Sequence, residues 1–192
     1  IDQDSAEDLF LNSVHTIDNE ISRVTSDQPE LRGMGTTLTS IALRDGKIAL
    51  LHIGDSRCYR LRGSDFEQLS RDHTVVQDLI ESKAISASEI ATHPQRSMLT
   101  QVLMGEGTAS PILMIFDVKP KDRFLLCSDG LSNVLTEKEI KSLVKKSDRD
   151  EAAKALIDAT YINGAPDNVT IVVADISEDG SQSIEMIGAA SL

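Results

Sequence analysis

Residues 123–130 read Arg123-Phe124-Leu125-Leu126-Cys127-Ser128-Asp129-Gly130, an apolar run that ends in a polar turn. A second apolar run, 169–174, follows the turn Ala165-Pro166-Asp167-Asn168. Nearly uninterrupted apolar runs predict strands that are covered on both faces, so we expect a second sheet on one face and helices on the other. The predicted fold class is α+β: an antiparallel β-sandwich flanked by helices.

Hydrophobic periodicity and turn residues predict the remaining elements. Strands are expected at 37–43, 47–53, 57–61, 98–104, 112–118, 123–127 and 169–176. Helices are expected at 4–24, 74–82, 136–146 and 149–161. A further short helix is expected to open at Ser86, with Glu89 completing a capping box. The stretch 72–96 therefore forms a helical flap inserted between strands.

Size and charge limit the class of protein. A chain of 192 residues with 40% hydrophobic content can bury one sizeable core, so a single domain is the default. The formal charge of −12 disfavours binding to nucleic acid and attracts divalent cations. Cys58 and Cys127 lie inside apolar runs without metal-ligand spacing, which predicts reduced core thiols in a cytoplasmic protein.

The N-terminal sequence carries no targeting signal. No run approaches the roughly 18 apolar residues that a membrane span needs, and no signal peptide follows Ile1. The chain starts without Met, so we expect a processed product, an excised domain or an incomplete record, and a membrane anchor outside this segment stays open.

Three aspartates stand in tight turns beside apolar strands. Asp55 and Asp129 follow strands, whereas Asp167 precedes one. In antiparallel neighbours the end of one strand lies beside the start of the next, so the three carboxylates can meet at one sheet edge. Clustered carboxylates repel unless a cation compensates them, and Mg²⁺ or Mn²⁺ prefers such oxygen ligands. Gly54 and Gly130 would permit the close backbone approach that this site needs.

Simpler interpretations compete with these assignments. Asp beside Gly, or Pro-Asp-Asn, is an ordinary turn signal when each is taken alone. The stretch 33–35 is interpreted as close packing, because a strand rather than a helix follows it. His73, which follows the expected helix cap Asp72, and His93, which precedes Pro94, are given structural roles. Arg57 is expected to pair with a carboxylate rather than with a phosphate.

Five separated motifs carry a resemblance to a known family. They are Gly33-Met34-Gly35-Thr36-Thr37, His52-Ile53-Gly54-Asp55-Ser56-Arg57, Thr92-His93-Pro94-Gln95-Arg96-Ser97, Leu126-Cys127-Ser128-Asp129-Gly130-Leu131 and Pro166-Asp167-Asn168-Val169-Thr170. In this order they resemble the metal-dependent type 2C protein serine/threonine phosphatases, in particular the bacterial branch that opposes membrane-bound serine/threonine kinases.

The resemblance implies a role for each matching residue. Asp167 would ligate the first of two Mn²⁺ or Mg²⁺ ions and Asp129 the second, and Asp55 would help Asp129 hold a third and weaker ion. Gly54, Gly130 and Asn168 would shape the site, and the flap at 72–96 would tune substrate access. No catalytic residue beyond the metal ligands is assigned, and the substrate-binding residues are not identified.

The first part of the family pattern is not found in this sequence. The family begins with a phosphate-binding Arg and a bridging aspartate in an Asp-Gly-Met-Gly-Gly motif, and Gly33-Met34-Gly35 belongs to a later motif. We therefore expect residues 1–176 to form an N-terminally incomplete catalytic domain, followed by a tail at 177–192 that could add a short edge strand. An uncovered sheet edge would then favour self-association.

The leading functional hypothesis is hydrolysis of phosphoserine and phosphothreonine in proteins by a metal-activated water. Its substrates would include phosphorylated serine/threonine kinases. One alternative is a catalytically silent, truncated or pseudo-phosphatase domain that binds phosphoproteins or a partner. A second alternative, a two-metal nucleotidyl cyclase or transferase, would need a basic phosphate clamp, for which the sequence offers no candidate. Whether these 192 residues turn over substrate alone is left open.

Overall fold

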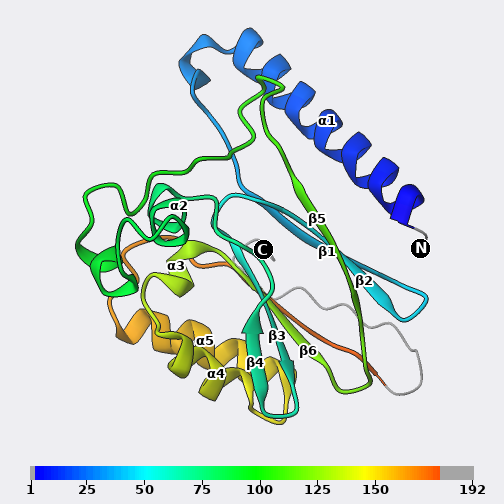
Figure 1. Cartoon of the computed structure of the whole chain (residues 1–192), viewed down its shortest axis with the longest axis vertical. Helices are drawn as coiled ribbons and strands as arrows, with labels where there is room; N and C mark the ends of the chain where they lie inside the picture. The colour runs from blue at the N-terminus through cyan, green and yellow to red at the C-terminus, as the bar shows by residue number, and fades with distance from the viewer. Residues whose placement is uncertain (1–2, 178–192) are drawn as a thin grey trace. The chain divides into compact units, whose positions relative to one another are not determined.

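The computed structural model describes residues 3–177 (Figure 1). Its chain divides into two compact units. The first consists of the residues up to Asp55 together with Arg71–Phe116, and the second consists of Ser56–Ser70 and the residues from Asp117 onward. The expectation of a single domain over residues 1–176 stays a prediction, and the tail beyond residue 177 lies outside the described residues.

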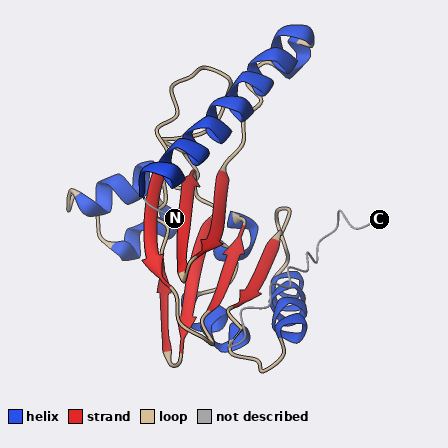
Figure 2. Cartoon of the chain, turned by 90° about the vertical axis from the view of Figure 1, so that its right-hand side faces the viewer, coloured by secondary structure: helices blue, strands red, loops and turns tan. Residues whose placement is uncertain are grey.

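A three-stranded sheet forms the centre of the first unit. Its strand order is β1 (Leu38–Arg44), β2 (Lys47–Ile53) and β5 (Ile112–Asp117). The β1–β2 hairpin closes through Asp45 and Gly46, whose φ values of 52° and 72° suit a two-residue turn. The long helix α1 (Gln3–Asp27) lies along this sheet (Figure 2) and packs Phe10 and Val14 into its core. The predicted helical stripe is confirmed at these positions.

Two short helices form the stretch predicted as a flap. Helix α2 (Val75–Glu81) has Thr74 as its N-cap, with the Thr74 side chain accepting a hydrogen bond from the Gln77 amide at 3.2 Å, so the assignment of Asp72 as cap was wrong. The 3₁₀ helix η2 (Ala87–Thr92) has the predicted capping box at its start. The Glu89 carboxylate accepts from the Ser86 amide at 2.8 Å. The mobility of the flap stays a prediction.

The strand predicted at 98–104 is wrong. This segment makes isolated bridges, Thr74 with Leu99 and Thr36 with Leu103, rather than a continuous ladder. Leu103 is fully buried in the first unit's core, so this one side chain anchors the segment by hydrophobic burial. The apolar pattern reflected this burial and not strand pairing. The turn-forming residues between α1 and β1 include a 3₁₀ helix, η1 (Pro29–Leu31).

A four-stranded antiparallel sheet forms the second unit. Its order is β4 (Asp65–Gln68), β3 (Arg57–Arg62), β6 (Arg123–Cys127) and β7 (Ile171–Asp175). Helices α3 (Asp129–Ser132), α4 (Glu137–Val144) and α5 (Arg149–Ile162) share a core with this sheet (Figure 1). Leu125 and Val173 meet Ile140 and Leu156 in that core. The α+β class and the helical cover of the second apolar run are confirmed, whereas its cover by a second sheet stays a prediction.

No helix in the described part of the chain is both long enough and apolar enough to cross a membrane.

Candidate metal centre

The ends of β6 and β7 bring two of the three aspartate turns together. Cys127, the last residue of β6, pairs with Ile171, the first residue of β7. Beyond this pair, the Ser128 amide donates to the Thr170 carbonyl at 2.9 Å, and the Thr170 amide donates to Ser128 Oγ at 3.0 Å. Ser128 Oγ also lies 3.3 Å from the Asn168 carbonyl oxygen, to which it donates. These bonds hold the Asp129 and Asp167 turns side by side, as the strand-end argument predicted.

Gly130 is required because two backbone segments approach closely. A Cβ atom on Gly130 would run into the backbone carbonyl of Asn168, which has no flexible end that could move aside. Gly130 is buried at the start of α3. The predicted site-shaping parts of Gly130 and Asn168 therefore have a steric basis in this structure.

The Asp129 carboxylate is held in an unfavourable environment. Burial raises the pKa of Asp129, and the negative charge of Asp167 raises this pKa further. Backbone hydrogen bonding at Gly130 and the positive charge of Arg57 oppose the rise without cancelling it. Asn133 Nδ2 donates to Asp129 Oδ2 at 3.1 Å, which orients the carboxylate. Paired carboxylates that repel each other are stabilised by a divalent cation, so the donor chemistry fits Mn²⁺ or Mg²⁺.

Arg57 lies at the same sheet edge. It is the first residue of β3 and pairs with Cys127, and its Nη1 donates to the Tyr59 hydroxyl at 3.1 Å. Its charge lowers the pKa of Asp129. The predicted ion pair of Arg57 with a carboxylate stays a prediction. The sequence predicted Asp129 as a metal ligand but did not indicate that Arg57 would act on it.

The Gly54–Asp55 turn is fixed within the first unit. The Gly54 amide donates to His73 Nδ1 at 3.1 Å, and the His73 amide donates to the Gly54 carbonyl at 2.8 Å. Gly54 has a φ of +104°, and a Cβ atom there would also collide with Thr37. His73 is buried and therefore has the structural role that was predicted for it. The parts of Asp55 and Gly54 in a metal site stay predictions, because they belong to the other unit from Asp129.

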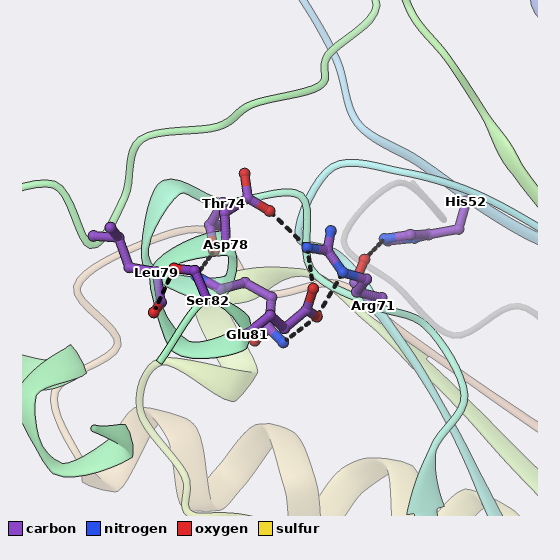
Figure 3. A network of polar contacts seen from close by, with 8 residues as sticks. His52, Arg71, Thr74, Asp78, Leu79, Glu81 and Ser82 are labelled. Carbon is purple, nitrogen blue, oxygen red and sulfur yellow. Dashed lines mark hydrogen bonds and ion pairs between the residues drawn. The ribbon is translucent and has the colours of Figure 1, made fainter. Parts of the chain in front are cut away.

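His52, at the end of β2 just before this turn, is bonded to Arg71, the residue before the flap (Figure 3). Its Nε2 donates to the Arg71 carbonyl at 2.8 Å, which leaves Nδ1 to accept from Thr39 Oγ1 at 2.9 Å. The Arg71 guanidinium in turn bonds Asp78 at 2.6 Å and Glu81 at 2.7 Å. His52 is fully buried, and burial, with the neighbouring His73 as a second cause, lowers the pKa of His52 to about 4.

The smaller sequence assignments have mixed outcomes. His93 accepts from the Gln95 amide at 3.2 Å, a local structural role as predicted. Close packing is confirmed at Gly35, where a Cβ atom would lie 2.9 Å from Met104, but Gly33 has open space and a φ of +86°. Ser128 was missed as a residue that joins two turns. Its position before Asp129 and Gly130 was the available signal, since serine commonly caps the start of a helix.

Among residues 3–177 no group of three or more His, Cys, Asp and Glu side chains is arranged to hold a metal ion. The aspartate pair of the second unit is therefore the candidate centre, with Asp129 and Asp167 as the residues that would hold a cation.

Comparison with known proteins identifies the family. The sequence profile of protein phosphatase 2C matches residues 2–161, and the chain belongs to this family. The serine/threonine protein phosphatase PstP of Mycobacterium tuberculosis is 42% identical over 149 residues, which are 78% of this chain and 29% of PstP. This chain thus corresponds to less than a third of that relative's length. The Listeria monocytogenes serine/threonine phosphatase stp is 30% identical over 171 residues, covering 88% of this chain and 68% of stp.

Solved structures have the same fold. A PstP catalytic domain in complex with two manganese ions matches with a TM-score of 0.78 and 36% identity, over 84% of this chain and 67% of that one. Stp1 from Staphylococcus aureus matches with a TM-score of 0.85 and 32% identity, over 92% of this chain and 70% of Stp1. The resemblance to bacterial type 2C phosphatases is confirmed.

Proposed function

We propose that this protein hydrolyses phosphoserine and phosphothreonine esters in proteins with the help of a divalent cation. The observation that carries the proposal is the Asp129–Asp167 pair at the end of β6 and the start of β7, where one carboxylate raises the pKa of the other. Family membership supports it, because the relatives are named serine/threonine phosphatases. No comparison supports the catalytically silent alternative.

Each residue at this sheet edge has a separate proposed role. A bound divalent cation would supply a nucleophilic water and positive charge for the phosphoryl oxygens. Asp129 and Asp167 would bind it through carboxylate oxygens, and Asn133 keeps Asp129 oriented by its 3.1 Å hydrogen bond. Gly130 lets the two turns approach, and the Ser128 bonds prevent them from separating. Asp55 is proposed as a further ligand, through which a third ion would be held with Asp129.

The cation is proposed to be Mn²⁺ or Mg²⁺, two per molecule. Support comes from the oxygen-only donor pair and from the two manganese ions in the related PstP domain. Phosphorylated proteins, including serine/threonine kinases, are the proposed partners. A cytoplasmic location is proposed because Cys58 and Cys127 are buried thiols that form no disulfide bond.

Self-association through a sheet edge is also proposed, since β7 is an edge strand of the second unit. Sedimentation velocity at a low and a high protein concentration tests it. A single monomeric species at both concentrations would count against the idea.

Turnover of a phosphothreonine peptide and of p-nitrophenyl phosphate by the full-length protein tests the main proposal. We expect activity with Mn²⁺ or Mg²⁺ and none in EDTA. Asp129→Asn should lower kcat/KM about a thousandfold, because it removes a carboxylate that holds the cation. Asp150→Asn, an exposed change on α5, is the matched control and should leave kcat/KM unchanged.

Turnover in EDTA, or full activity of Asp129→Asn, would overturn this proposal. Calorimetric titration with Mn²⁺ separates it from the silent alternative. Sub-millimolar binding at two sites supports an enzyme, whereas phosphopeptide binding without turnover supports the alternative.

A further inference from the structure

A basic cavity of about 410 Å³ lies at the opposite end of β6 from the aspartate pair. Four of its lining residues are basic: Lys121, Arg123, Lys145 and Lys146. Asp175 is the acidic residue among the described residues that line it. Arg123 begins β6, whereas Asp129 follows its end, so the two sites are separated by roughly 17 Å of extended strand.

Arg123 builds the wall of this cavity. Its guanidinium, of which little is exposed, pairs with Asp175 through bonds of 2.6 and 2.7 Å. It also donates to the carbonyls of Val144 at 2.9 Å and Lys146 at 2.5 Å. Asp175 offsets the Arg123 charge, and the guanidinium donors are occupied by structural bonds. Arg123 therefore fixes the segment that follows α4 and is not the group that would meet a ligand.

Lys145 and Lys146 are the groups that this arrangement presents. Both are exposed and follow directly after the last residue of α4. Because Arg123 binds the carbonyls of Val144 and Lys146, the backbone that carries the two ammonium groups is held at the cavity rim.

Lys121 is an independent observation at the same cavity. Its φ of 71° lies in the left-handed region, which costs a lysine about 1 kcal/mol or more relative to glycine. The strained turn is fastened to the end of β7, since the Lys121 amide donates to the Ile176 carbonyl at 2.9 Å and the Ile176 amide donates to the Asp122 carbonyl at 2.8 Å. The fold thus holds a third ammonium group at this cavity at a cost in backbone energy.

We propose that this cavity binds an acidic segment of a protein partner, with its carboxylates on Lys121, Lys145 and Lys146. Among the described residues that line it, four are basic and one is acidic, so it is locally positive in a chain with a formal charge of −12. Leu61 and Ile176 give it an apolar wall for a neighbouring side chain. The overall negative charge disfavours a nucleic acid as occupant. Resting on the proposed function, the partner is a phosphoprotein substrate whose acidic run lies about five residues from its phosphorylated residue.

Binding of a labelled hexaglutamate peptide, followed by fluorescence anisotropy at low ionic strength, tests the cavity without any turnover. The double variant Lys145→Gln/Lys146→Gln should weaken binding about tenfold, because it removes two of the cavity's ammonium groups. Lys138→Gln/Lys141→Gln on α4 removes the same charge outside the cavity and should change binding less than twofold. Equal losses in the two variants, or no loss in either, would overturn the proposal. So would inorganic phosphate that binds as tightly as the peptide.

A kinetic measurement on a metal-loaded protein ties the cavity to substrate choice. With a phosphothreonine peptide that carries six glutamates, the Lys145/Lys146 variant should raise KM about tenfold and leave kcat unchanged. A peptide with serines in place of the glutamates, and p-nitrophenyl phosphate, should be hydrolysed equally by variant and parent. If no protein hydrolyses any substrate, the proposed function fails while the anisotropy result still decides the cavity. Equal KM values for the acidic peptide would overturn the link to substrate.

Discussion

The two ends of strand β6 carry opposite charges in different environments: Arg123 lies at its start, and Asp129 follows its end. At its start, the Arg123 guanidinium pairs with Asp175 and donates to helix-end carbonyls, and the hydrogen bond with Asp175 raises the pKa of Arg123. At its far end, Asp129 faces a second carboxylate, and its pKa is raised by burial and by Asp167. The charge of Arg123 is satisfied within the fold, whereas Asp129 leaves charge for a ligand to satisfy. Such unfavourable arrangements are concentrated at functional sites.

Removing Arg123 should have the largest effect on stability. Arg123→Gln leaves the Asp175 carboxylate without its partner and several carbonyls without a donor, so we expect a loss of about 4 kcal/mol in the free energy of unfolding. Urea unfolding measures this loss. Activity on p-nitrophenyl phosphate below the unfolding range should be unchanged, because Arg123 is remote from Asp129 along β6.

Arg44→Gln provides the control, since the Arg44–Asp45 pair is 3.5 Å long and exposed. Its expected cost is about 0.5 kcal/mol or less. Similar losses in the two variants would mean that the basic end of β6 is not a stabilising structure.

A comparison of the two ends of β6 at acid pH must allow for His52 in the first unit, because His52 also makes the stability of the fold depend on pH. The pKa of His52 is lowered to about 4, whereas the unfolded chain's histidine titrates near 6.5. Between these two pH values the histidine is protonated in the unfolded chain but stays neutral in the folded protein. The stabilising contribution is therefore complete above pH 6.5 and is lost as pH falls to about 4, by roughly 3 kcal/mol at most.

Urea unfolding at four pH values between 4.5 and 7.5 measures this slope. His52→Gln should be less stable at pH 7.5, because the Thr39 and Arg71 bonds are disturbed, but its stability should depend less on pH. A His52→Gln slope equal to that of the parent would show that other groups cause the acid sensitivity.

The acidic end of β6 could be predicted from the sequence, whereas the basic end could not. Asp129 follows one apolar run and Asp167 precedes the next, and the antiparallel pairing of β6 with β7 brings such positions together. The capping box at Ser86 and Glu89 was equally local and was found. The basic cavity combines residues from the turn before β6, the end of α4 and the end of β7. No spacing within one segment indicates that combination.

The two wrong predictions, a strand at 98–104 and Asp72 as a helix cap, also have physical causes. The segment at 98–104 has strand-like apolar spacing, yet its burial is met by Leu103 alone and its pairing by single bridges. Asp72 is a good capping residue by type, but Thr74 takes the position. Tertiary bridges decided the first case, and the local sequence does not indicate them. The second case is local, because the Thr74 side chain accepts from the Gln77 amide three residues later.

Gly130→Ala should disturb the acidic end without removing a charge. The added Cβ atom would meet the Asn168 backbone carbonyl, so the two turns must separate, at about 2 kcal/mol in the free energy of unfolding. We expect phosphatase activity to fall much further, about a hundredfold, because Asp129 and Asp167 move apart. Ser132→Ala on the same short helix should retain activity. An active Gly130→Ala variant would contradict the need for this close approach.

The smallest expected effect concerns α4, the helix that directly precedes the two cavity lysines. Thr136 caps α4: its Oγ accepts from the Glu139 amide at 3.3 Å, and the Glu139 carboxylate accepts from the Thr136 amide at 2.8 Å. Thr136→Ala should cost about 1 kcal/mol in the free energy of unfolding, whereas Thr136→Ser keeps the cap and should cost a few tenths at most. Urea unfolding of both variants measures the difference, and equal stabilities would contradict the capping role. Hexaglutamate binding should weaken in neither variant at low temperature, because Arg123 and not the cap fixes Lys145 and Lys146 at the cavity.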